Sequence, residues 1–276
     1  MESIEKIQIL LTNDDGIRSP GLWAAAGALS DLGYVHVAAP RDQFSGAGRS
    51  MPSTSDGTIR PVQVQVNGKV WTVYAVGGTP AQTVQHAVLE ILPRKPNLVV
   101  SGINYGENVG SGVTVSGTVG AALEAASLGI PALAISLETE QSHHLSYSTD
   151  VDFSAAAYFA RFFARLLLDY PMPEDVHVLK VDVPSEASPE TPWRMTRLSM
   201  QRYFEAVPPD RRSWDHPGAV GYRLAEKRYQ ATDDSDVYAL SVKRLVAVTP
   251  LSLDLTSRVN LADMEALLRG GAKSAP

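Results

Sequence analysis

The sequence predicts an α/β protein with a doubly wound, mainly parallel, Rossmann-like sheet. Through the first 136 residues, short apolar runs typical of buried strands alternate with segments whose apolar residues recur at helical spacing. Polar, glycine-containing loops follow several of these strands, as is common at the carboxyl edge of such a sheet. With 276 residues, 44 % of them hydrophobic, the chain can bury a substantial core.

The elements follow in order along the chain. A strand is expected over residues 6–12 and another over 34–39, with a helix between them that opens at Pro20, a residue suited to a first helical turn. Asn67-Gly68 separates two alternating runs, which favours a β-hairpin over 61–66 and 70–76. Periodicity and run length further predict a helix over 79–92, a strand over 97–101, a helix after the N-cap residue Ser116, a strand over 132–136, a helix over 153–168 and a strand over 176–183.

The pattern changes beyond residue 183, which divides the chain into two predicted parts. Residues 1–183 form the α/β core that carries the site, and residues 184–276 form an extension that packs on it. The segment 184–236 is rich in proline, charge and aromatic residues, which favours an extended arm or hairpin lying on another surface, such as that of a second subunit. A strand over 237–248 and a short helix over 261–268 complete the extension, which we expect to serve oligomerisation as a homodimer or homotetramer.

Composition excludes several classes of partner. The net charge of −6 gives no basis for a DNA-binding surface or an anionic membrane partner. The chain has no cysteine, which removes disulfides, thiolate metal ligands and cysteine nucleophiles. No apolar run approaches the length of a membrane span, and the N-terminal residues lack the organisation of a signal peptide. We therefore expect a cytoplasmic protein.

The stretch ILLTNDDG, residues 9–16, ends a buried strand with two adjacent carboxylates, Asp14 and Asp15. Two readings stay open for these residues alone. A divalent cation would cancel their mutual repulsion, and the oxygen donors in the neighbouring loops suit Mg²⁺, Mn²⁺ or Ca²⁺ better than Zn²⁺. Alternatively, Asp14 caps an ordinary turn and Asp15 faces solvent.

The loop SGINYGENVGSGVTVSGTVG, residues 101–120, indicates a phosphate site. Its glycines let backbone N–H groups approach an anion, and the helix that begins after Ser116 presents its positive end there. A flexible loop with a capping serine is the simpler reading. The pair His143-His144 is interpreted as part of a surface loop.

Four ordered motifs resemble those of the SurE survival-protein nucleotidases. They are ILLTNDDGIRSPG (9–21), APRDQFSGAGRS (39–50), VSGINYGENVG (100–110) and VSGTVGAALEA (115–125). The resemblance implies a metal-dependent phosphatase that hydrolyses nucleoside 5′- or 3′-monophosphates to nucleoside and inorganic phosphate. One divalent ion per subunit, Mg²⁺ or Mn²⁺, would be held by Asp14, Asp15, Ser45 and Asn104.

The same resemblance implies that Asn108 and the turn Ser116-Gly117-Thr118 hold the substrate phosphate. As our own mechanistic hypothesis, Asp14 and Asp15 are the catalytic residues, and Asp14 is the candidate to accept a proton from the attacking water because it comes first out of the strand. The chain departs from the family pattern at Gln82, where the family often has an acid, and Gln82 is given no catalytic role.

Three alternatives accompany this hypothesis. A phosphoaspartate mechanism would replace direct attack by water. A haloacid-dehalogenase-type phosphatase would need Asp-x-Asp after the first strand, but the chain has Asn13-x-Asp15 there. A non-catalytic sensor that binds a nucleotide or metal would keep the scaffold and lack turnover.

Overall fold

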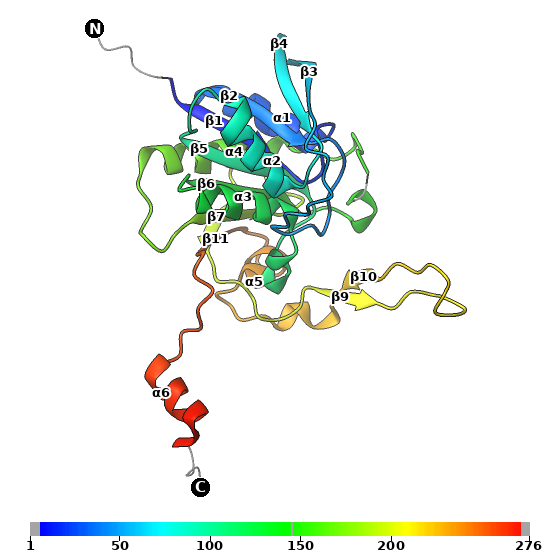
Figure 1. Cartoon of the computed structure of the whole chain (residues 1–276), viewed down its shortest axis with the longest axis vertical. Helices are drawn as coiled ribbons and strands as arrows, with labels where there is room; N and C mark the ends of the chain where they lie inside the picture. The colour runs from blue at the N-terminus through cyan, green and yellow to red at the C-terminus, as the bar shows by residue number, and fades with distance from the viewer. Residues whose placement is uncertain (1–5, 145, 272–276) are drawn as a thin grey trace.

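The structure, a computed structural model, describes residues 6–144 and 146–271. Its centre is a nine-stranded sheet with the order β3-β4-β2-β1-β5-β6-β7-β11-β8 (Figure 1). The strands are β1 Gln8–Thr12, β2 Tyr34–Pro40, β3 Ile59–Val66, β4 Lys69–Val76, β5 Leu98–Tyr105, β6 Ala132–Leu137, β7 Val178–Val183, β8 Trp193–Met195 and β11 Val246–Leu251.

The run of strands from β4 to β7 is parallel throughout, and antiparallel pairs occur at β3–β4 and β7–β11. The chain leaves β1 toward β2 on one side and returns to β5 on the other side, so the strand order reverses between β1 and β5. This reversal defines the doubly wound fold that the sequence predicts, and it places the ligand-binding crevice at the carboxyl ends of β1 and β5.

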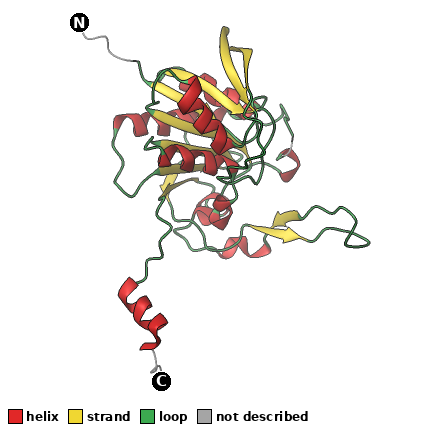
Figure 2. Ribbon diagram, viewed as in Figure 1, coloured by secondary structure: helices red, strands yellow, loops and turns green. Residues whose placement is uncertain are grey.

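Helices cover both faces of the sheet (Figure 2). The helices α1, Pro20–Leu29, and α4, Ser154–Asp169, pack together over one face, and α2, Pro80–His86, and α3, Gly117–Ser127, pack over the other. Shorter helical turns lie at 87–91, which continues α2, and at 110–114, 141–143, 226–230 and 267–271. Two apolar cores lie on the two faces of the sheet. Because successive side chains of a strand point to opposite faces, the residues of one strand contribute alternately to the two cores.

The hairpin around Asn67-Gly68 is confirmed, with both turn residues at positive φ. The strand after residue 97 is longer than expected. It continues through Asn104 to Tyr105 past an irregularity in its pairing with β6 between Ser101 and Asn104. Gly102 allows this, because its φ is +131° and a Cβ there would lie 2.2 Å from the carbonyl oxygen of Ile135.

The predicted strand over 237–248 is wrong. Residues 236–241 form the helix α5, Asp236–Ser241, and the strand β11 begins only at Val246. The hydroxyl of Ser235 caps α5 by accepting a hydrogen bond from the N–H of Tyr238. The buried residues Val237 and Leu240 lie three positions apart, which fits one face of a helix, whereas the two would point to opposite faces of a strand.

The extension contributes to the core and also leaves it. Two of its strands, β8 and β11, complete the main sheet, whereas the hairpin β9 Phe204–Val207 and β10 Gly221–Leu224 projects from the body. The helix α6, Leu261–Ala266, stands apart at the end of an extended segment (Figure 1). The division at residue 183 and the oligomerisation role stay predictions. Of the helices described, none has the length and apolar character needed to cross a membrane.

Candidate active site

Several polar segments meet at the carboxyl edge of the sheet, where β1 and β5 diverge. The carbonyl oxygen of Asp14, after β1, accepts the N–H of Phe44 from the loop after β2 at 2.8 Å. The Asp14 side chain reaches Thr118 at the start of α3, and the Asp15 side chain reaches Tyr105 at the end of β5. These contacts join segments that lie up to 104 residues apart in the sequence.

Asp14 lies against the N-terminus of α3. The hydroxyl of Thr118 donates to its Oδ1 at 2.5 Å, and a Cβ on Gly117 would lie 2.6 Å from the Asp14 Cβ, so only glycine permits this approach. Burial raises the pKa of Asp14, and hydrogen bonds from Thr118 and from backbone N–H groups, including that of Gly117, partly offset the effect. In this structure, therefore, the aspartate itself takes up hydrogen-bond donors of the helix N-terminus.

Asp15 is 2 % exposed and lies beside Asp14. Its Oδ2 accepts the N–H of Tyr105 at 3.2 Å, and its Oδ1 accepts from Nε2 of Gln43 at 3.1 Å. Burial and the neighbouring charge of Asp14 raise the pKa of Asp15 well above its ordinary value. The reading in which Asp15 faces solvent is wrong, and two buried adjacent carboxylates make a site that a cation would stabilise.

Asn104 and Ser45 offer neutral oxygens near this pair. The amide nitrogen of Asn104 donates to the carbonyl oxygens of Tyr105 and Gly106, at 3.2 and 2.7 Å, so its Oδ1 points away from them. Ser45 is exposed and directly follows Phe44, whose N–H binds the Asp14 carbonyl. The described residues contain no group of three or more His, Cys, Asp or Glu that could hold a metal. The available donor set is thus two carboxylates with neutral oxygens, which fits a hard divalent cation.

Asn108 and Ser116 have defined partners of their own. The N–H of Asn108 donates to Oδ1 of Asp182 at 2.7 Å, and its amide nitrogen donates to Oγ of Ser136 at 2.8 Å. The amide carries a second hydrogen that is available to an anion. Ser116 is the N-cap of α3, as predicted, since its Oγ accepts the N–H of Val119.

Three residues near the aspartates were not predicted from the sequence. Gln43 bridges Oδ1 of Asp15 and the carbonyl oxygen of His144, and the hydroxyl of Tyr147 donates to the carbonyl oxygen of Asp15 at 3.0 Å. His144 lies in a turn, as the loop prediction has it, but its ring is half-buried against Gly106 instead of fully exposed. Gln43 lies within a motif loop and could have been considered, but nothing in the sequence links residues 144–147 to this edge.

Gln82 has a structural role that explains the departure from the family pattern. Its Oε1 accepts from the N–H of Thr79 and from the hydroxyl of Ser55, and its Nε2 donates to the carbonyl oxygen of Pro52 at 2.9 Å. An ionised acid cannot donate to a carbonyl oxygen. The amide therefore ties the start of α2 to the segment 52–55.

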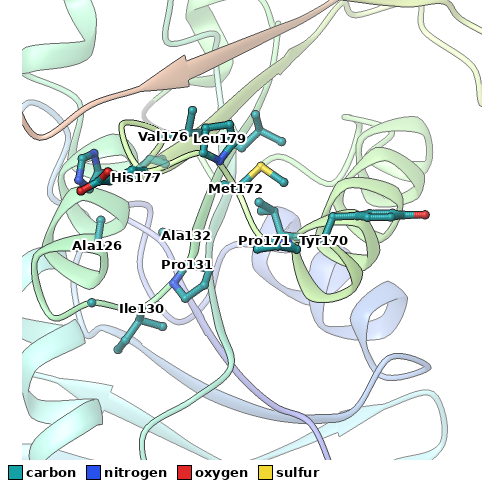
Figure 3. Close-up of a pocket in the computed structure, with 15 residues that line it drawn as sticks. Ala126, Ile130, Pro131, Ala132, Tyr170, Pro171, Met172, Val176, His177 and Leu179 are labelled. Carbon is teal, nitrogen blue, oxygen red and sulfur yellow. The ribbon is translucent and has the colours of Figure 1, made fainter.

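That segment lines a cavity of about 280 Å³ whose wall also contains Arg41, Asp42 and Phe44. Neither aspartate lines this cavity, but Phe44 connects it to the site, because its N–H binds the carbonyl oxygen of Asp14. A second cavity, of about 320 Å³, has a mainly apolar lining that includes Ile130, Met172 and His177 (Figure 3). It lies at the amino ends of β6 and β7, the opposite edge of the sheet, and contains none of the predicted site residues.

The fold and the site together define a class, a doubly wound α/β protein with two buried carboxylates packed against a helix N-terminus at the strand switch point. A family model described as survival protein SurE matches residues 9–205. The chain therefore belongs to the SurE family, as the resemblance of its motifs implied.

Individual relatives agree with this assignment along nearly the whole chain. A protein of Thermococcus kodakarensis named 5′-nucleotidase SurE is 41 % identical over 262 residues, which cover 95 % of this chain and 98 % of that protein. One of Archaeoglobus fulgidus with the same name is 41 % identical over 266 residues, covering 96 % and 98 %. The crystal structure of SurE from Aquifex aeolicus superposes with a TM-score of 0.74 at 31 % identity, covering 96 % of this chain and 99 % of that one. Membership of this family sets aside the haloacid-dehalogenase alternative.

Proposed function

We propose that the chain is a phosphoric monoester hydrolase that converts nucleoside monophosphates to nucleoside and inorganic phosphate. The observation that carries the proposal is the pair Asp14 and Asp15, buried side by side against the N-terminus of α3 at the switch point of the sheet. Relatives that match nearly end to end are named 5′-nucleotidases, which favours the 5′-monophosphates as substrates.

The proposal includes one divalent cation, Mg²⁺ or Mn²⁺, with Asp14, Asp15, Asn104 and Ser45 as its ligands. The raised pKa of both carboxyl groups and the free direction of the Asn104 oxygen support this set. When bound, such an ion polarises the phosphate ester and lowers the pKa of a coordinated water.

Residues of the chain supply the phosphate contacts, the proton acceptor and the cavity for the nucleoside. The N–H groups of Gly117 and Thr118 at the start of α3, with the Asn108 amide, would hold the non-bridging phosphate oxygens and stabilise their charge once the Asp14 carboxylate, which accepts from both N–H groups in this structure, releases them. Water attacks phosphorus opposite the ester oxygen, and the ester bond breaks as the new bond forms. Asp14 accepts the proton of the water and later releases it to solvent, and the nucleoside oxygen takes a proton from solvent as it leaves. The cavity beside Phe44 is where we place the nucleoside.

The test is phosphate release from a panel of nucleoside 5′- and 3′-monophosphates by protein that has been stripped of metal and then supplied with Mg²⁺ or Mn²⁺. We expect no release from the stripped protein and full activity after metal is restored, because the two carboxylates need the cation to act on the ester. Protein that binds nucleotide but releases no phosphate with any metal would contradict the proposal and favour a sensor.

We further propose that the protein is a homodimer or homotetramer. The helix α6 and the turn after it expose Leu261, Met264, Leu267 and Leu268, and the hairpin β9–β10 projects from the body (Figure 1). An amphipathic helix that stands apart leaves its apolar side chains in water, which a partner subunit would cover.

Deleting residues 258–276 should therefore lower the mass measured by light scattering, with the CD spectrum of the core retained. A full-length chain that is monomeric at micromolar concentration would contradict the oligomer proposal without affecting the proposed activity.

A further inference from the structure

A lysine and two aspartates are buried together behind the candidate phosphate loop. Lys180 and Asp182 lie on β7, Asp236 is the first residue of α5, and none of the three is exposed. The ammonium of Lys180 pairs with Oδ2 of Asp182 and, at 3.2 Å, with Oδ2 of Asp236. Burying three charges is costly, and such a group is weak evidence for stability by itself. Its other contacts indicate what it does.

Both carboxylates accept hydrogen bonds from the backbone of the loop that follows β5. Oδ1 of Asp182 accepts the N–H of Asn108 at 2.7 Å, and Oδ2 of Asp236 accepts the N–H of Gly110 at 2.9 Å. Ser136, which lies opposite Asp182 in the pairing of β6 with β7, accepts from the amide nitrogen of Asn108 at 2.8 Å. Asn108 is thus held from two adjacent strands, at its main chain by Asp182 and at its side chain by Ser136.

We propose that Asp182 is a positioning residue for phosphate, which acts by fixing Asn108 in the orientation that presents its remaining amide hydrogen to the substrate. The inference rests on the proposed function, in which Asn108 contacts phosphate. By this inference the buried charges contribute to substrate binding. They affect the contacts to phosphate and not the ligands of the metal. The partners of Asp182 among the described residues are Asn108 and Lys180, and neither belongs to the proposed metal set.

The chemistry of the two contacts requires a carboxylate at position 182. Both partners are donors, and they use different oxygens of the side chain. Asparagine has a single acceptor oxygen, which the buried ammonium of Lys180 would take, so its NH₂ group would face the N–H of Asn108. In the Asp182→Asn variant, Lys180 and Asp236 still form a neutral ion pair. The variant should therefore fold, with Asn108 released from its main-chain acceptor.

The experiment is calorimetric titration of the full-length protein with inorganic phosphate and, separately, with Mn²⁺, alongside steady-state hydrolysis. In Asp182→Asn we expect the phosphate Kd and the substrate KM to rise about tenfold, the effect of losing a hydrogen bond to a charged group. The Mn²⁺ affinity should stay within about twofold of wild type, because no metal ligand is disturbed. Glu138→Gln is the matched control, since it removes one carboxylate from the ion pair with Arg244 and has no described hydrogen bond to Asn108.

The outcomes separate the possible failures. Unchanged phosphate affinity in folded Asp182→Asn, or equal losses of phosphate and Mn²⁺ affinity, would overturn the positioning role while wild-type hydrolysis leaves the proposed function intact. A wild-type protein that neither binds nor releases phosphate would overturn both. If Asp182→Asn does not fold, Ser136→Ala decides, because it releases Asn108 from the other side without touching a buried charge. A phosphate Kd raised about threefold supports the inference and an unchanged Kd contradicts it.

Discussion

Replacing Asp14 or Asp15 with asparagine should lower kcat by about 10²- to 10³-fold while the protein stays folded. Each substitution removes one of the two formal negative charges that would hold the cation, and the neutral oxygens of Asn104 and Ser45 cannot replace it. Asp14→Asn also removes the proposed proton acceptor. The measurement is phosphate release at saturating Mg²⁺ or Mn²⁺, with CD spectra to establish folding and Asp31→Asn, an exposed residue at the end of α1, as control.

Although Asp15→Asn should lower turnover, it should raise the thermal stability of the metal-free protein. The folded protein raises the pKa of Asp15 well above the 3.8 of a free side chain, chiefly by burial and then by the charge of Asp14. Folding therefore favours the protonated carboxyl group. The stability that protonation of Asp15 contributes is fully present below the unfolded pKa and is lost as the pH rises through the folded pKa.

In EDTA at pH 7, Asp15→Asn should accordingly melt a few degrees above wild type, and the difference should shrink toward pH 4. Added Mn²⁺ should reverse the order, because only wild type has the full charge to bind it. Near-normal turnover in both variants, or a less stable Asp15→Asn in EDTA at pH 7, would contradict a metal site at these residues.

Much of the fold can be predicted from short stretches of sequence, because turns and helix caps depend on a few neighbouring residues. Asn67-Gly68 adopts positive φ easily and so specifies its hairpin, and Ser116 supplies the acceptor that α3 needs at its first turn. The sheet topology then follows from alternating strands and helices, which places Asp14 and Asp15 at the switch point. The motif residues needed no further information to be identified as candidates.

Long-range contacts could not be predicted in the same way. The partnership of Lys180 with Asp236 joins a strand to a helix 56 residues later, in a segment where the sequence pattern predicts a strand instead. Asn104 lies on β5 instead of a loop, because Gly102 lets the strand continue past an irregular pairing. Such features depend on which chain segments become neighbours, and a pattern within one segment carries little information about that.

Replacing Lys180 with methionine should have the largest effect on stability, a loss of about 3–5 kcal/mol in the free energy of unfolding. The side chains are similar in length, so packing changes little. Although burial alone would lower the pKa of Lys180, the charges of Asp182 and Asp236 raise it overall, and the ammonium is therefore the charged partner at neutral pH. Urea unfolding at pH 7 measures the loss, and a difference below about 1 kcal/mol would contradict the argument.

A second substitution tests whether the uncompensated carboxylates cause the loss. Without Lys180, Asp182 and Asp236 are two like charges in the interior. Backbone N–H groups of Asn108, Gly110, Ser199 and Val237 donate to them, but these neutral donors do not replace the charge of an ammonium. Adding Asp182→Asn to Lys180→Met removes one of these charges, so the double variant should be more stable than Lys180→Met alone. If the lysine contributed only packing, the second substitution would add its own cost instead. The sign of this coupling separates charge compensation from packing.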